Sequence, residues 1–180
     1  MAIKNRPEFE KFIRRVEKSS DEFRTSSTEK RHSKQYRTAR ENLAHLVDQD
    51  SFLEFGQFAV AAQRSRRDYE ELQNKTNADG IITGFCSVNS ALVGAENSQA
   101  VAIVYDYSVL AGTQGAFHHL KLDRICDQAK EFELPIVIFT EGGGGRPGDT
   151  DVLIQMAGLH IPSFSTWAQL TGSSLKIAVN

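Results

Sequence analysis

The spacing of apolar residues near the N-terminus predicts a helical arm. Phe9, Phe12, Ile13 and Val16 recur at i, i+3, i+4 and i+7, which places them on one face of a helix over residues 7–23. The next stretch, RTSSTEKRHSKQ at 24–35, contains no apolar residue and favours an exposed linker. We therefore expect residues 1–37 to form a helical arm and linker, and residues 38–180 to form the main body.

The main body alternates between strand and helix patterns. Thr38 with Glu41 three residues later is typical of a capping box and predicts the first helix of this part. Apolar, β-branched runs predict strands at 51–55, 80–89, 100–110, 134–140 and 175–179, and helical spacing predicts helices at 116–132, 151–160 and 163–170. This succession indicates an α/β domain. Because a buried-looking strand comes last, we also expect the chain to be a fragment of a longer one.

Composition limits the class of protein. The chain has 180 residues, 40% hydrophobic and 24% charged, with a formal net charge of −2. These values are ordinary for one soluble domain, and they argue against a nucleic-acid partner, which usually requires a basic face. No signal-peptide core and no run long enough for a membrane span is visible, so we expect a cytoplasmic location and no membrane partner. Cys86 and Cys126 lie in apolar stretches and are interpreted as reduced core residues.

Four consecutive glycines, Gly142 to Gly145, follow a predicted buried strand and precede Arg146. Glycine is needed where φ is positive or where a ligand must approach the main chain closely. Amides exposed after a strand can cradle a phosphate or stabilise an oxyanion. The run lacks the lysine of a P-loop, and Pro147 stands where a dinucleotide fingerprint continues into its helix. An oxyanion site, another anion site and a flexible turn without function remain open.

A second glycine loop offers Gly112, Gly115 and, two turns into the next helix, Lys121. His118 and His119 have no carboxylate or serine at a spacing that predicts a catalytic dyad, so we interpret them as packing or surface residues. Other polar residues have simple interpretations: Arg64, Arg66 and Arg67 form a solvated face or a phosphate contact, and Asp149 and Asp151 cap the helix that follows them. No spacing of His, Cys, Asp and Glu predicts a metal site.

Five segments, in order, resemble the N-terminal, acyl-CoA-binding half of the carboxyltransferase component of biotin-dependent acyl-CoA carboxylases. They are TARENLAHLVDQDSFLEFG, ADGIITGFCSVN, YDYSVLAGTQGAFHHLKLDRICDQA, IFTEGGGGRPGDTD and IPSFSTWAQLTGSSLKIAV. The third resembles the family's D-F-T-V-x-G-G-S-x-G segment and the fourth its D-S-G-G-A-R loop. Departures are Ala111 for a family glycine, Gly145 for an alanine, and GAENSQA at 94–100, which looks like an insertion.

The resemblance implies a crotonase-like fold, a ββα spiral that is incomplete here, with the helical arm ahead of it. It implies that backbone amides of Gly143, Gly144 and Gly145 stabilise the thioester enolate. It also implies that Gly112, Gly115, Lys121 and Arg146 bind the substrate or shape its loop, and that Arg64 and Arg67 reach the nucleotide phosphates.

The same resemblance implies the cofactor and the partners. Biotin would arrive as carboxybiotin on a carrier domain, without covalent attachment to this chain, and the carboxyl acceptor would be an acyl-CoA; no metal is expected in this chain. The expected partners are the biotin carboxyl carrier and biotin carboxylase components, the C-terminal carboxyltransferase half, and further copies in a homo-oligomer. Two other functions stay open: another crotonase-type acyl-CoA enzyme, a hydratase or decarboxylase, and a non-catalytic interaction subunit.

We expect the 180-residue chain alone to show no measurable carboxyltransferase activity. In crotonase-like sites the second oxyanion amide comes from the loop after the next strand, beyond Asn180. An assay with carboxybiotin and acetyl-CoA checks this, and carboxylation by the isolated chain would contradict it.

Overall fold

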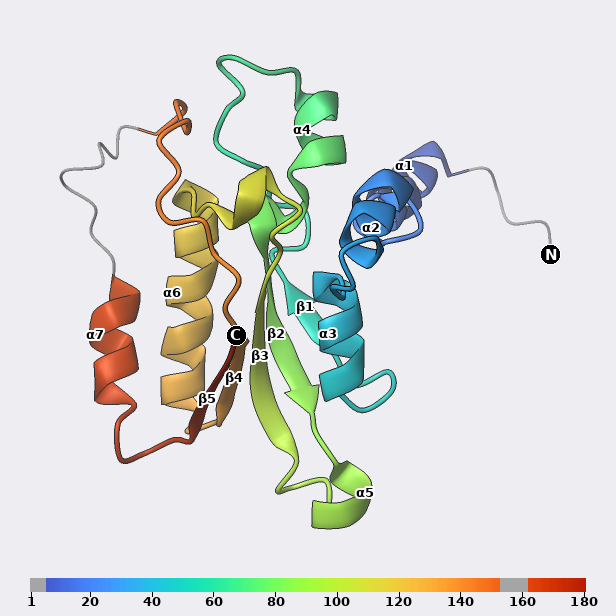
Figure 1. Cartoon of the computed structure of the whole chain (residues 1–180). Coiled ribbons are helices and arrows are strands. Elements are labelled where there is room, and N and C mark those ends of the chain that lie inside the picture. Colours follow the sequence, from blue (N-terminus) through green and yellow to red (C-terminus); the bar gives the residue numbers. More distant parts are fainter. Residues whose placement is uncertain (1–5, 153–161) are drawn as a thin grey trace.

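A computed structural model describes residues 6–152 and 162–180 of the chain (Figure 1). Its helices are α1 (Pro7–Glu17), α2 (Thr25–His32), α3 (Ala39–Leu46), α4 (Tyr69–Lys75), α5 (Ser90–Val93), α6 (Ala116–Glu131) and α7 (Pro162–Gln169). Its strands are β1 (Leu53–Phe55), β2 (Ile81–Ser87), β3 (Gln99–Tyr105), β4 (Ile136–Phe139) and β5 (Lys176–Val179), and two 3₁₀ turns are η1 (Asn77–Gly80) and η2 (Leu110–Gly112). No helix in the described ranges is long and apolar enough to cross a membrane.

The five strands form one mixed sheet in the order β1-β2-β3-β4-β5. β1, β2 and β3 pair antiparallel, whereas β3, β4 and β5 pair parallel. Because Ile81 at the start of β2 pairs with Tyr105 at the end of β3, the turn η1 lies at the same sheet edge as the loops that follow β3 and β4. This edge therefore collects η1 and both glycine loops.

Helices cover both faces of the sheet, as Figure 1 shows, with α6 and α7 on one side and α3 on the other. On the α6 side, Ile103, Ile125 and Ile136 belong to one buried apolar cluster. On the α3 side, Leu43 packs with the small residues Ala100 and Ala102 in a second cluster. Burial on both faces explains why β3 reads as a continuous apolar run. The predicted α/β class is confirmed.

The predicted linker at 24–35 is wrong, because most of it is the helix α2. This helix has no apolar face and no buried residue, so packing does not hold it. Arginine side chains attach it to the sheet edge: Arg24 contacts the carboxylate of Asp106 at 2.7 Å, and Arg31 contacts both carboxylate oxygens of Glu141 at 2.5 and 2.7 Å. A pattern of hydrophobic residues cannot reveal attachment by distant charges.

Some features predicted from the sequence differ from the structure, and others are confirmed. The first helix ends at Glu17, well before residue 23, as turns from Lys18 onward take over. The strand predicted to reach residue 110 ends at Tyr105. The capping box of Thr38 and Glu41 is confirmed. The two cysteines are free and buried, as expected. The helix predicted at 151–160 falls almost entirely outside the described residues.

Arg24→Met tests how the arm is held. The side chains of Arg24 and Asp106 are only 8% and 12% exposed, so removing one partner leaves a buried charge and should lower the free energy of unfolding by about 3 kcal/mol. Chemical denaturation and limited proteolysis of residues 7–35 measure the effect. Lys11→Met is the control, since it removes a solvent-exposed pair with Glu8 and should change almost nothing. Equal effects of the two substitutions would contradict a buried attachment.

Candidate active site

The turn η1 enters β2 with three consecutive residues in the left-handed region. Ala78, Asp79 and Gly80 have φ of 51°, 51° and 75°, and all three are buried. Only glycine adopts this conformation without cost, so the surroundings must hold the first two residues in place. The structure shows three basic side chains on the turn, those of Arg146, His118 and Lys121. Residues far apart in sequence thus stabilise a strained segment at the sheet edge.

The central contact is an ion pair between Arg146 and Asp79, whose side chains are 4% and 0% exposed. The same guanidinium donates to the carbonyl of Thr113 at 2.6 Å and lies 3.6 Å from the carboxylate of Asp149. The second carboxylate oxygen of Asp79 accepts the N–H of His118 at 2.7 Å. Burial raises the pKa of Asp79, and the charge of Arg146 acts against that shift. One ion pair therefore connects η1 with both glycine loops.

Asp149 caps a helix, but a different one from the helix we predicted. Its carboxylate accepts the N–H of Ala116, the first residue of α6, at 2.9 Å and also accepts from Gln63 at 3.1 Å. Asp151 accepts the backbone N–H groups of Arg64 and Ser65 at 2.5 and 2.8 Å. The helix that both acids were predicted to cap lies almost entirely outside the described residues, and the contacts described here join them to amides earlier in the chain.

Three of the glycines are required by contacts within the chain. A Cβ on Gly112 would collide with the carbonyl of Glu141, and one on Gly143 would collide with the carbonyl of Ala111. The two loops are joined here by the N–H of Gly143, which donates to the carbonyl of Gly112 at 2.9 Å. A Cβ on Gly115 would collide with Arg146 and Asp149. These glycines let the two loops touch at their backbones.

Gly144 and Gly145 have no such explanation, since a Cβ on either would meet nothing within 4 Å. Gly144 has φ of 80°, which favours glycine for conformational reasons, whereas Gly145 lies outside the left-handed region. Both are exposed, and within residues 6–152 and 162–180 neither N–H has an acceptor. The carbonyl of Gly144 is fixed by the N–H of Gln114 at 2.8 Å. The loop thus has two adjacent exposed residues whose amide donors have no acceptor among the described residues.

His118 and His119 do not form a catalytic dyad. His118 is completely buried, packs edge-on against Tyr105 with ring centroids 4.8 Å apart, and places Nδ1 3.3 Å from the carbonyl of Asp79. Burial lowers its pKa to about 3, so the ring stays neutral. Burial also lowers the pKa of His119. This geometry agrees with a packing role for His118.

The remaining predicted residues are engaged in contacts of their own. The ammonium of Lys121 donates to the carbonyls of Ala78, at 2.9 Å, and Ile81, and burial lowers its pKa to about 8. Just before α4, Arg67 pairs with Glu71 of that helix at 2.7 Å. The guanidinium of Arg64 lies 4.3 Å from the ring centroid of Tyr69. The structure therefore brings Lys121 and Arg146 to η1 and places Arg64 and Arg67 in the segment before α4, in contact with its first turn. Among the described residues, no group of three or more His, Cys, Asp or Glu is arranged for a metal ion.

Sequence reasoning missed a cavity of about 570 Å³ between α2 and the two glycine loops. Its lining includes Lys30, Lys34, Tyr36, Tyr107 and Glu141. Lys30 and Lys34 lie in the stretch that we interpreted as a linker. A basic run with a neighbouring tyrosine was visible in the sequence, but its meaning depends on the attachment of α2 to the sheet edge.

His118→Phe should reduce the acid sensitivity of the fold. A histidine that stays neutral in the folded chain takes up a proton on unfolding below its ordinary pKa near 6.5, so stability falls as pH is lowered. At pH 5 this amounts to about 2 kcal/mol. Phenylalanine keeps the contact with Tyr105 and cannot titrate. Denaturation of both proteins from pH 7.5 to pH 5 measures the difference, and parallel curves would show that His118 is accessible to protons in the folded state.

Comparison with known proteins places this geometry in a family. The family model for the carboxyl transferase domain matches residues 30–158. The beta subunit of acetyl-coenzyme A carboxylase carboxyl transferase from Clostridium kluyveri is 33% identical over 114 residues, which cover 60% of this chain and 37% of that protein.

Two solved structures extend the match to nearly the whole chain. A single-chain, multi-domain long-chain acyl-CoA carboxylase superposes with a TM-score of 0.89 and 46% identity, covering 97% of this chain and 17% of its own. The transcarboxylase 12S hexamer with hydrolysed methylmalonyl-CoA bound gives a TM-score of 0.62 and 25% identity, covering 91% and 30%. The chain spans well under half the length of each of these proteins. It belongs to the carboxyl transferase domain family, with the crotonase-like fold that the sequence implied.

Proposed function

We propose that this chain is the acyl-CoA-binding part of a biotin-dependent carboxyltransferase, in which exposed amides of the glycine loop hold the thioester oxygen. The observation that carries the proposal is the pair of unpaired N–H groups on Gly144 and Gly145, fixed at a sheet edge. The similar proteins named above are an acetyl-CoA carboxylase subunit, a long-chain acyl-CoA carboxylase and a transcarboxylase with a CoA thioester bound. An acyl-CoA is common to all three.

The chemistry requires such donors. Taking a proton from the carbon next to a thioester moves negative charge to the carbonyl oxygen, and preorganised N–H groups at about 3 Å lower the barrier. Carboxybiotin on its carrier domain would supply the carboxyl group, and the biotin nitrogen that releases this group would take up the proton. The chain itself binds the thioester, orients it and stabilises the developing charge.

The structure supports a division of roles among the predicted site residues. Because the N–H of Gly143 is already bonded to Gly112, we assign this loop's contribution to the oxyanion site to Gly144 and Gly145, beside the second amide expected beyond Asn180. Arg146, with its buried partner Asp79, shapes the loop and does not reach the substrate. Lys121 holds η1 in the same way. Gly112 and Gly115 serve close packing of the loops.

A hydratase-like reaction is less well supported. It requires a side-chain acid or base near the thioester, and His118 is buried and neutral. We further propose that the complete enzyme acts with biotin carboxylase and biotin carrier components and a C-terminal carboxyltransferase half, as a homo-oligomer. The hexamer described for transcarboxylase 12S supports the last point. The 46% identity to a long-chain acyl-CoA carboxylase favours a long-chain acyl group.

Gly145→Ala in the complete enzyme tests the proposal. Nothing in the chain opposes the added methyl group, so the free energy of unfolding should stay equal or rise by about 0.5 kcal/mol. The methyl group would occupy the space where the thioester approaches, and kcat/KM for acyl-CoA should fall by about 100-fold, as for loss of one oxyanion donor. Steady-state carboxylation and chemical denaturation are the two measurements.

Gly142→Ala is the matched control. It adds the same methyl group three residues earlier in the loop, but directs it at the ring of Tyr105, where the contact would be an ordinary 3.5 Å. We expect it to change kcat/KM by less than about threefold, within the range of a tolerated surface change. If Gly145→Ala is equally harmless, Gly145 has no close ligand, and a turn without catalytic function explains it better.

A further inference from the structure

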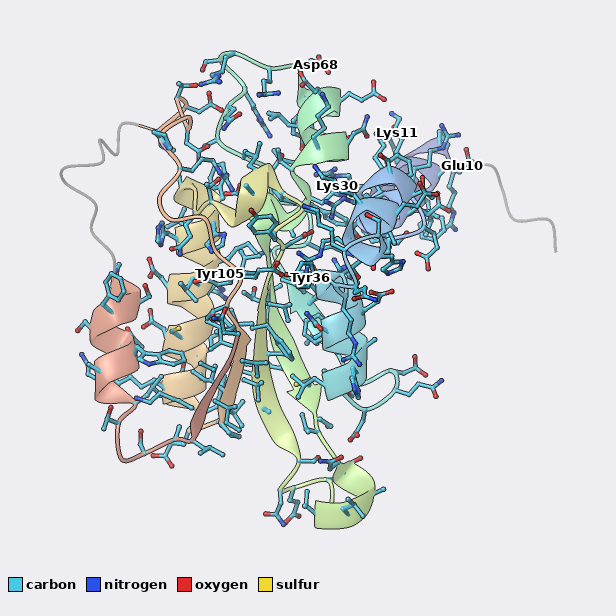
Figure 2. The ribbon with its side chains drawn as sticks, viewed as in Figure 1. Glu10, Lys11, Lys30, Tyr36, Asp68 and Tyr105 are labelled. Atoms are coloured by element: carbon cyan, nitrogen blue, oxygen red, sulfur yellow. The ribbon has the colours of Figure 1, made fainter. Side chains whose placement is uncertain are left out.

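A groove of about 580 Å³ lies between α1 and α4 and shares no lining residue with the cavity beside the glycine loops. Lys11 on α1 and Asp68 at the start of α4 are labelled in Figure 2. The rings of Phe12, Phe58 and Tyr69 line the groove and are 49%, 38% and 42% exposed. Phe12 and Phe58 meet edge to face with their centroids 5.7 Å apart. The groove therefore offers aromatic surface that no described segment covers.

The rim of this groove is basic. Four basic side chains line it against one acidic side chain, namely Lys11, Arg14, Arg15 and Lys18 against Glu8. Glu8 contacts Lys11 in a solvent-exposed pair, and Arg15 donates to the carbonyl of Phe58 at 2.9 Å. Lys18 lies 3.6 Å from Glu70, whereas Arg14 contacts no carboxylate among the described residues. An occupant that fits must combine an apolar side chain with neighbouring carboxylates.

The same chain carries such a group at the end of α6. Phe132 is 56% exposed and stands between Glu131 and Glu133, and its ring meets that of Phe85 edge to face at 5.9 Å. Neither glutamate forms an ion pair within residues 6–152 and 162–180. Outside α1 and the groove, no other exposed large apolar residue in the described ranges stands between two carboxylates.

The groove and Phe132 cannot meet within one copy of the chain, because α4 and the C-terminal end of α6 lie at opposite ends of the molecule (Figure 1). We propose that Phe132 of one copy inserts into the groove between α1 and α4 of a second copy, with Glu131 and Glu133 facing the basic rim. The contact joins two different surfaces, so its repetition forms a ring or a filament. The inference rests on the homo-oligomer proposed above and names the surfaces that would form it.

Apolar and charged groups contribute differently to this contact. Burial of the Phe132 ring removes apolar surface from water and supplies most of the affinity. The glutamates select the orientation, since like charges brought together are costly. Leu92 on α5 is 83% exposed, but its neighbours Ala91 and Val93 carry no charge, so it does not match the basic rim. It therefore provides a matched control for Phe132.

Cysteine cross-linking in the complete enzyme tests the contact. Gln73→Cys places a thiol at the groove, and Glu131→Cys places one beside Phe132. The native cysteines of the described residues, Cys86 and Cys126, are buried and should not react. On mild oxidation the double variant should form disulfide-linked chains on a non-reducing denaturing gel. The wild type and each single variant should stay unlinked.

Charge reversal gives a second measurement by sedimentation over a dilution series. Glu131→Lys with Glu133→Lys should weaken association at least about tenfold, and Lys11→Glu with Arg14→Glu should do the same. The four substitutions together should return the dissociation constant to within about threefold of the wild type, because opposite charges again face each other. Phe132→Ser should weaken association by about tenfold, whereas Leu92→Ser should not.

Each other result overturns the inference in a recognisable way. Linking by Gln73→Cys alone would show that two grooves face each other. Losses that add up in the fourfold variant would show that the charges do not meet. An enzyme that sediments as an oligomer but does not link in the double variant forms its oligomer through other surfaces.

Sedimentation of the wild type as a single copy would contradict the homo-oligomer itself, and the inference with it. Carboxylation of acyl-CoA by the same wild-type preparation reports on the proposed carboxyltransferase function separately, because that assay does not depend on which surfaces join the copies.

Discussion

The buried ion pair of Asp79 and Arg146 is the contact on which the site depends. Taking both charges out of water is costly, and such a pair is maintained only where further hydrogen bonds satisfy the remaining donors and acceptors. Here the guanidinium also reaches the carbonyl of Thr113, and the carboxylate also accepts from His118. The pair therefore links the entry to β2, the start of α6 and the glycine run after β4. These three segments meet because β2 runs antiparallel to β3 while β4 runs parallel to it.

Two short left-handed runs lie at the same sheet edge. One comprises the residues of η1, and the other is Leu110, Ala111 and Gly112, with φ of 48°, 57° and 67°. Non-glycine residues in this region store strain, which persists only when neighbouring contacts determine the conformation. Lys121 and Arg146 bind the carbonyls of η1, and the loop after β4 packs on Gly112. Strain and basic side chains together give a rigid platform, as preorganised amide donors require.

The arm completes the site without contributing an apolar core. Its arginines, Arg24 and Arg31, bind Asp106 and Glu141, which follow β3 and β4 at the edge where the glycine loops lie. The side of α2 that they bring into place forms one wall of the cavity. Attachment of α2 by charge, rather than by packing, is consistent with the absence of buried residues in this helix. Placement of this cavity wall thus depends on two ion pairs that span more than 80 residues of sequence.

By itself, the sequence determined the α/β class, the strands of the sheet, the capping box at Thr38 and the family, because these depend on local periodicity and short motifs. It also identified the glycine loops as the region of interest. Only the tertiary structure decided which glycines serve the fold and which face open space: Gly143 meets the carbonyl of Ala111, whereas Gly145 meets nothing. The same holds for α2 and for the buried positions of Arg146 and Lys121. Their environments arise from residues distant in the chain, and no local pattern of hydrophobic and polar residues encodes such contacts.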